Sequence, residues 1–277
     1  MCRWLAYSGA PLFLEELIFK PKHSLIDQSL SSNDDDIATN GDGFGIGWYG
    51  KQPYPGVYRE TQPAWNDDNL RDLAAQIESP LFLAHVRAAT GAAVQQTNCH
   101  PFRHGQWLFV HNGSIQDFRS LRRELTLAVA PELFPYIVGT TDSEIMFFLA
   151  LTFGMQEDVV GGVERMVGII EDVAGKHGIQ NPLQMTLGIS DGRRIYAFRY
   201  SSEGKSRTLF HSRSKEAIQE LHPDVGELPD ELRIVVSEPF SDLTDLWVEI
   251  PESSVLIVEH GELSPQPFAP QRSHQLA

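Results

Sequence analysis

The order of the expected elements along the chain is the strongest constraint on its fold. Segments typical of strands cluster near both ends of the 277-residue sequence, and helical patterns lie between them. Asp191-Gly192 between two apolar segments predicts a β-hairpin, and residues 163–174 carry apolar side chains at helical spacing. No internal repeat or linker divides the chain. We therefore expect one α+β domain, residues 1–260, with antiparallel sheets packed against helices, followed by a loosely ordered tail, residues 261–277.

Local patterns predict the structure of several shorter segments. Residues 11–19 and 65–77 carry apolar side chains at helical spacing, whereas residues 20–40 are polar and irregular and predict a long loop. Residues 41–49 alternate glycine with larger residues. The glycines are in the wrong order for a dinucleotide-binding loop, and no helix pattern follows them. This segment therefore favours a strand whose glycines allow another part of the backbone to approach closely.

Charge and composition exclude several classes of function. The formal net charge of −15 leaves no basic surplus for binding a nucleic-acid backbone. No apolar run approaches the ~20 residues that span a bilayer, and the first residues do not resemble a signal for export. Two cysteines cannot build a disulfide framework. We expect a cytoplasmic protein with reduced thiols that contacts neither membrane nor nucleic acid.

One of the two cysteines, Cys2, directly follows the initiator methionine. Because cysteine is small, we expect Met1 to be removed, which leaves a thiol and a free α-amine on one residue. With ordinary pKa values of about 8.5 for the thiol and about 7.7–8 for the amine, the amine can accept the thiol proton near neutral pH. Such a residue supplies a nucleophile and its base together. On this stretch alone, a small apolar residue at the start of a buried strand is the better-supported interpretation.

Four further pieces can carry chemistry, and each has a structural alternative. Arg87 ends an expected strand and suits bidentate carboxylate recognition, although for a lone arginine an ion pair with a surface acid is the better-supported interpretation. His100 belongs to a Cys-His-Pro turn with no metal-ligand spacing, so we expect no metal. Asn112 and Gly113 offer a side-chain amide and a backbone N–H for an oxyanion hole, or a tight turn. Asp142 begins an apolar helix inside a capping-box pattern and can hold an ammonium group, or serve only as a first-turn acid.

In this order behind Cys2, the pieces resemble the class II glutamine amidotransferases, Ntn-hydrolases with an N-terminal cysteine nucleophile. The resemblance implies an αββα sandwich, with two antiparallel sheets between helix layers, and a reaction without cofactor or metal. It also implies a role for each candidate. Arg87 and Thr90 would bind the α-carboxylate of glutamine, Asn112 and Gly113 would form the oxyanion hole, Asp142 would hold the α-amine, and His100 would line the pocket.

The resemblance is greatest to small stand-alone members, which include γ-glutamyl amidases. We therefore expect cleavage of the side-chain amide of glutamine, or of a γ-glutamyl amide, through a thioester on Cys2. No synthase domain fits in the remaining chain, so an ammonia-accepting synthase would be a separate partner. Association into a homo-oligomer stays open. Two alternatives are a γ-glutamyl peptidase that acts on a thiol-containing compound and a non-catalytic binding or regulatory subunit of the same fold.

Overall fold

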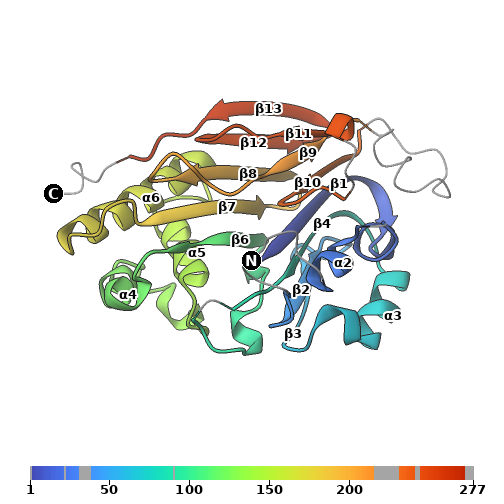
Figure 1. The fold of residues 1–277 in the computed structure, drawn as a ribbon, viewed down its shortest axis with the longest axis horizontal. Coiled ribbons are helices and arrows are strands. Elements are labelled where there is room, and N and C mark those ends of the chain that lie inside the picture. The colour runs from blue at the N-terminus through green and yellow to red at the C-terminus, as the bar shows by residue number, and fades with distance from the viewer. Residues whose placement is uncertain are drawn as a thin grey trace.

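The computed structural model describes residues 2–21, 23–30, 39–89, 91–214, 231–240 and 244–271. Over these ranges the strands form two antiparallel sheets, and helices lie on the outer side of each sheet (Figure 1). The arrangement confirms the expected α+β class.

The first sheet has seven strands within the described residues, in the order β11-β9-β10-β1-β4-β2-β3. All neighbouring pairs are antiparallel. The central pairing of β1 with β4 sets Arg3 opposite Val86, so the residue before β1 lies beside the residues that follow β4. The strands are β1 (Arg3–Phe13), β2 (Phe44–Trp48), β3 (Gly56–Glu60), β4 (Glu78–Val86), β9 (Phe210–Ser212), β10 (Arg233–Val236) and β11 (Trp247–Glu249).

The second sheet has six strands in the described chain, in the order β13-β12-β8-β7-β6-β5. The predicted hairpin at Asp191-Gly192 is confirmed between β7 and β8. Gly192 has a φ of 89°. The Asp191 side chain accepts the backbone N–H groups of Arg193 and Arg194, as is typical of aspartate in a tight turn. The strands are β5 (Phe102–His104), β6 (Trp107–Ile115), β7 (Leu183–Ser190), β8 (Arg194–Ser201), β12 (Ser254–Glu259) and β13 (Glu262–Pro267).

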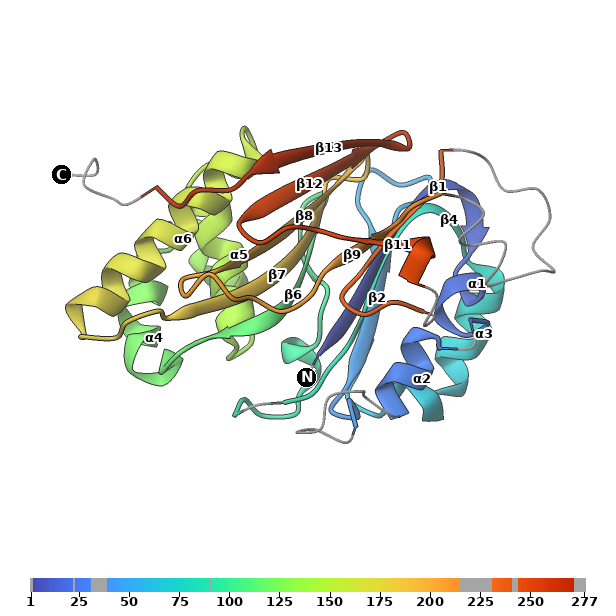
Figure 2. The same ribbon diagram turned by 45° about the horizontal axis from the view of Figure 1, so that its top comes forward.

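Helices cover the two outer faces, and the two sheets pack against each other between them (Figures 1 and 2). Aromatic and aliphatic side chains from both sheets, among them Trp4, Leu83, Val110, Ala197 and Val258, form the cluster between the sheets. This order of layers is the αββα sandwich that the sequence predicts. The helices are α1 (Glu15–Ile18), α2 (Leu25–Leu30) and α3 (Asp68–Gln76) on the first sheet, and α4 (Phe118–Leu127), α5 (Asp142–Thr152) and α6 (Val159–Lys176) on the second.

The glycine-rich strand β2 confirms the expected close approach of two backbones. A Cβ atom on Gly45 would lie 2.2 Å from the His100 carbonyl oxygen, and one on Gly47 would lie 2.8 Å from side-chain carbons of Leu108 and Pro101. Glycine is therefore required here because the chain around residue 100 crosses directly over β2.

Two predictions for the first 40 residues are wrong. β1 continues to Phe13, so only Glu15–Ile18 of the expected helix 11–19 is helical. Pro11 is tolerated because the β1–β4 register is irregular between Ser8 and Leu12, where a ladder hydrogen bond is not needed. The expected loop 20–40 contains helix α2, which buries Leu25 and Ile26. Residues 31–38 lie outside the described part of the chain.

Two further corrections concern strand ends. Asn112 and Gly113 form no turn, because β6 continues through them and pairs with β7 as far as Ile115. The expected loose tail from residue 261 is wrong over Glu262–Pro267, which forms β13 and pairs with β12 along its whole length. Its prolines are tolerated because β13 is an edge strand. Phe268, 3% exposed, closes the core behind it; residues 272–277 lie outside the described chain.

Because the chain crosses closely over β2, the stability of the protein should be sensitive to the size of the side chain at Gly45. We expect Gly45→Ala to lower the free energy of unfolding by about 1–3 kcal/mol, because the added methyl forces the backbone at His100 to move. Denaturant unfolding measures this change. Gly50→Ala is the matched control, since a Cβ there meets nothing within 4 Å. Equal stability of the two variants would contradict the tight crossing.

Candidate active site

Cys2 directly precedes β1, beside the residues that follow β4. Its Sγ accepts the backbone N–H of Ala88 at 3.4 Å and lies 3.5 Å from the Ala88 carbonyl oxygen, to which the thiol can donate. Two residues later, the Trp4 indole N–H donates to Thr186 Oγ1 on the second sheet at 3.1 Å. The first residues of β1 are therefore held by both sheets, and the position of the sulfur atom is fixed.

Burial raises the pKa of the Cys2 thiol above its ordinary value of 9.0. The Ala88 N–H and the positive charge of Arg87 favour the thiolate, but their effect is smaller than that of burial. The resting thiol is therefore protonated at neutral pH. A reaction at this sulfur requires a base that removes the proton during attack.

Cys2 opens into a cavity of about 570 Å³ with walls from both sheets and from the starts of α4 and α5. This volume suits a small-molecule ligand. Of the seven residues that the sequence singles out, five line the cavity: Cys2, Arg87, His100, Gly113 and Asp142. Asn112 is not part of the cavity wall, and Thr90 lies outside the described residues.

Arg87 presents a buried guanidinium to the cavity. It is 4% exposed and forms no ion pair with any residue that the structure describes. Among the described residues, the guanidinium donates to two backbone carbonyls, of Asp42 at 3.3 Å and of Ala92 at 3.5 Å. A buried cation that lacks a carboxylate partner is costly, so the cavity favours a ligand that carries a carboxylate.

Asp142 is held rigidly in the first turn of α5. The Thr141 side chain caps this helix by accepting the Glu144 N–H, which confirms that half of the capping-box pattern. Asp142 Oδ2 accepts the N–H of Ile115 at 2.9 Å, and Oδ1 accepts the N–H of Ser143 at 2.8 Å. Oδ1 also accepts the Ser143 hydroxyl at 3.2 Å. Oδ2 keeps a lone pair free, so the carboxylate can accept a further hydrogen bond from a ligand in the cavity.

Gly113 faces the cavity from β6, and Asn112 lies one residue earlier. A Cβ on Gly113 would lie 1.9 Å from the Gln184 carbonyl oxygen of β7, so no other residue fits without movement. Asn112 is 4% exposed. The strand therefore presents a backbone segment without a side chain in the wall of the cavity that Cys2 also lines.

Three buried histidines form a cluster at the cavity: His100 and His111 line its wall, and His85 lies next to them. The sequence analysis had singled out only His100. Its ring lies 4.1 Å from the ring of His85, and His111 Nδ1 lies 2.8 Å from Ser143 Oγ. Burial lowers the pKa of His85 to about 3 and lowers those of His100 and His111. All three rings are therefore neutral at physiological pH. The position of His111 directly before Asn112 is the one sequence signal that could have revealed it.

The mouth of the cavity carries two arginines that the sequence analysis missed. Arg119 and Arg122 are three residues apart on α4, so they share one face of that helix. Both side chains are exposed, and nothing in the sequence distinguishes them from ordinary surface arginines.

Among the described residues, no three His, Cys, Asp or Glu side chains are grouped as metal ligands. Over the same residues, no helix has the length and apolar character that crossing a membrane requires.

An αββα sandwich with a cysteine at the head of a central strand, facing a cavity, has the architecture of the Ntn-hydrolases. The chain belongs to the class-II glutamine amidotransferases, because the model of that family matches residues 24–277. The matched range begins after Cys2, so the position of the sulfur atom rests on the geometry above.

Curated relatives cover nearly the whole chain. A probable glutamine amidotransferase of Saccharomyces cerevisiae, DUG3, is 30% identical over 94% of this chain and 82% of its own length. A gamma-glutamyl-hercynylcysteine sulfoxide hydrolase of Mycolicibacterium smegmatis is 27% identical over 97% of this chain and 100% of its own length.

Solved structures agree with this assignment. A glutamine aminotransferase class-II domain protein from Silicibacter pomeroyi superposes with a TM-score of 0.73 and 33% identity, over 97% of this chain and 100% of the other. The glutamine phosphoribosylpyrophosphate amidotransferase of B. subtilis, at 14% identity, shares the fold with a TM-score of 0.65 over 98% of this chain and 50% of its own.

The raised pKa of Cys2 has a measurable consequence. Without substrate, we expect the rate of Cys2 alkylation by iodoacetamide to keep rising above pH 9, because the thiolate fraction increases throughout that range. Intact mass against time measures this rate, and Cys2→Ala identifies the labelled site. The fully buried Cys99, whose pKa burial raises to about 11, should stay unlabelled in the folded protein. A rate that levels off below pH 8 would contradict the buried, protonated thiol.

Proposed function

We propose that this enzyme hydrolyses the side-chain amide of glutamine or of a γ-glutamyl amide, with Cys2 as its nucleophile. The observation that carries the proposal is the placement of a thiol, a carboxylate and a guanidinium without an ion pair to any described residue on the walls of one cavity. The relatives in yeast and Mycolicibacterium, an amidotransferase and a γ-glutamyl hydrolase by name, support the same reaction.

Substrate selection rests on the two charged side chains. Arg87 binds the α-carboxylate, because its buried guanidinium has free donors and no competing acid within the described residues. Asp142 binds the α-ammonium through Oδ2, which accepts one hydrogen bond, from the Ile115 N–H, and keeps a lone pair. Fixing both ends of the amino-acid head places the distal amide at the sulfur of Cys2. His100 in the wall completes the described part of this pocket; Thr90, predicted to bind the same carboxylate, lies outside the described residues.

The chemistry proceeds through a thioester. After removal of Met1, the α-amine of Cys2 accepts the thiol proton, and the sulfur forms a bond to the δ-carbonyl carbon. The oxyanion accepts hydrogen bonds from the Gly113 N–H and from the Asn112 amide, which must turn toward the sulfur. Collapse breaks the C–N bond, and the amine leaves with the proton. Water then attacks the γ-glutamyl thioester, so glutamate forms and the thiol regains a proton.

The size of the cavity favours a γ-glutamyl amide whose leaving amine is larger than ammonia. The space of about 570 Å³ extends past Gly113 and Asp142 to the side chains of α4. With glutamine itself as substrate, the released ammonia would go to a separate synthase. We place the protein in the cytoplasm, where thiols stay reduced.

Removal of the sulfur tests the proposal most directly. We expect Cys2→Ala to reduce release of glutamate from glutamine and from γ-glutamyl-glycine by on the order of 10⁴-fold or more, since no other group can form the thioester. A coupled glutamate assay measures both substrates. Cys99→Ala is the control, because Cys99 is buried outside the cavity wall and should leave the rate largely intact.

The same preparation separates the alternatives. Faster hydrolysis of γ-glutamyl-glycine than of glutamine favours the γ-glutamyl hydrolase, and the reverse favours the amidotransferase. If the wild-type protein hydrolyses neither substrate and an electrophilic glutamine analogue adds no mass to Cys2, the protein is a non-catalytic member. An active protein whose mass still includes Met1 would contradict the α-amine as the base.

Loss of the Arg87 charge should weaken binding rather than chemistry. We expect Arg87→Gln to raise KM for glutamine by about 10–100-fold with little change in kcat, because the carboxylate contact is the same in ground and transition states. Steady-state kinetics separate the two constants. Arg123→Gln, an exposed arginine outside the cavity wall, controls for net charge. A fall in kcat at constant KM would exclude this role for Arg87.

A further inference from the structure

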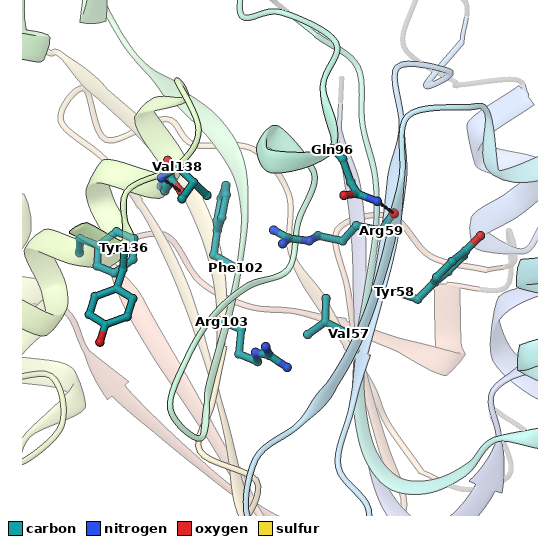
Figure 3. A pocket seen from close by; sticks show the side chains of 10 residues that line it. Val57, Tyr58, Arg59, Gln96, Phe102, Arg103, Tyr136 and Val138 are labelled. Atoms are coloured by element: carbon teal, nitrogen blue, oxygen red, sulfur yellow. Dashed lines mark hydrogen bonds between the residues drawn. The ribbon is translucent and has the colours of Figure 1, made fainter. Parts of the chain in front are cut away.

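A second cavity, of about 280 Å³, lies between the edge strands of the two sheets, β3 and β5. We call it the Arg59–Arg103 pocket; its walls are formed by residues 57–59, Gln96, residues 102 and 103, Tyr136, Val138, Glu144 and Phe148. Figure 3 shows the guanidinium groups of Arg59 and Arg103 extending into the space between the two strands. Nothing in the proposed reaction uses this pocket.

Both guanidinium groups keep most of their hydrogen-bonding capacity free. Arg59 donates to the Cys99 carbonyl oxygen at 3.3 Å, and Arg103 donates to the Pro55 carbonyl oxygen at 3.0 Å. Neither arginine forms an ion pair within the part of the chain that the structure describes. An arginine carries five N–H donors, so the pair can still bind an anionic group between them.

The electrostatics of the pocket favour an anion. Burial lowers the pKa of Arg59; the charges of Cys99 and Glu144 oppose this shift, and the charge of Arg103 adds to it. The one acidic side chain in the wall, Glu144, already accepts the N–H groups of Val138 at 3.1 Å and Gly139 at 2.7 Å. A ligand anion would offset the repulsion between the two arginines, in a chain whose net charge of −15 otherwise repels anions.

The remaining walls are apolar. Phe102 is buried, whereas Tyr136 and Val138 stay 56% and 60% exposed at the opening. Apolar and aromatic side chains beside a few charged groups are typical of the walls of small-molecule sites. The volume accommodates about one aromatic ring with an anionic substituent.

The pocket is separate from the catalytic cavity, although one segment of chain forms a wall of each. Ala92, Ala93 and His100 line the catalytic cavity, whereas Gln96 and Phe102 line the pocket. Gln96 is fixed to β3, because its side-chain amide donates to the Arg59 carbonyl oxygen at 2.8 Å (Figure 3).

We propose that the Arg59–Arg103 pocket is a second ligand site that binds a small organic anion. Its carboxylate or phosphate group lies between the two guanidinium groups, and its apolar part packs against Phe102 and Tyr136. The site is independent of the thiol chemistry, so it exists whether or not the proposed hydrolysis is correct.

Isothermal titration of the full chain with four probes tests the proposal. Phenyl phosphate and benzoate represent the two anionic groups, inorganic phosphate lacks the ring, and benzyl alcohol lacks the charge. We expect saturable millimolar or tighter binding of at least one aromatic anion, weaker binding of inorganic phosphate and none of benzyl alcohol. The tighter aromatic anion identifies the anionic group. Absence of saturable binding by both aromatic anions would overturn the proposal.

Variants locate the bound probe. Arg59→Gln and Arg103→Gln should each weaken binding by about tenfold or more, whereas Arg123→Gln and Arg87→Gln should not. Loss of binding in Arg87→Gln alone would place the anion in the catalytic cavity and overturn the proposal. Arg59→Lys and Arg103→Lys retain the charge, and thermal unfolding checks that each variant is folded. If these two variants bind like the wild type, a pair of positive charges suffices; if they bind like the Gln variants, the guanidinium geometry is required. Unchanged binding in both Gln variants would show that the pocket is not the site.

Discussion

The antiparallel pairing of β1 with β4 is the constraint on which the site depends. Because Arg3 lies opposite Val86, the residue before β1 must meet the residues after β4. Cys2 therefore contacts Ala88, whose N–H points at the sulfur, and Arg87 reaches the same cavity. A shift of one residue would turn every side chain of β1 to the opposite face and separate the sulfur from the guanidinium.

The catalytic cavity combines rigidly held polar groups with neutral, buried side chains. Gly113 and Asp142 are fixed by β6, β7 and the first turn of α5, and Asp142 has both oxygens in hydrogen bonds to backbone N–H groups. The neutral, buried histidines next to these groups fill space without adding charge. Among the described residues of the cavity wall, the charges near the sulfur are thus those of Arg87 and Asp142, which suits a ligand with both a carboxylate and an ammonium group.

The sequence predicted the class of fold, the β7–β8 hairpin and the glycine-rich strand because each rests on a local pattern: alternation, Asp-Gly chemistry and glycine spacing. Strand ends were predicted poorly. Asn112-Gly113 has turn chemistry, but pairing with β7 overrides it. Residues 11–13 begin a helical pattern but extend β1, because β4 supplies a partner for Leu12 and Phe13. Candidate residues of the site were found through their order along the chain. His111, Arg119 and Arg122 were missed because only the folded arrangement of β6 and α4 turns them toward the cavity.

The other edge of β1 has a consequence for synthesis of the protein. Trp4 exchanges backbone and side-chain hydrogen bonds with Ser237, and β10 pairs along Leu5–Ser8. During translation, the first strand emerges from the ribosome long before its second neighbour has been made. The strand that follows Cys2 therefore lacks its β10 partner until residues 233–236 have been synthesised, so the sheet around the catalytic centre cannot be completed before then.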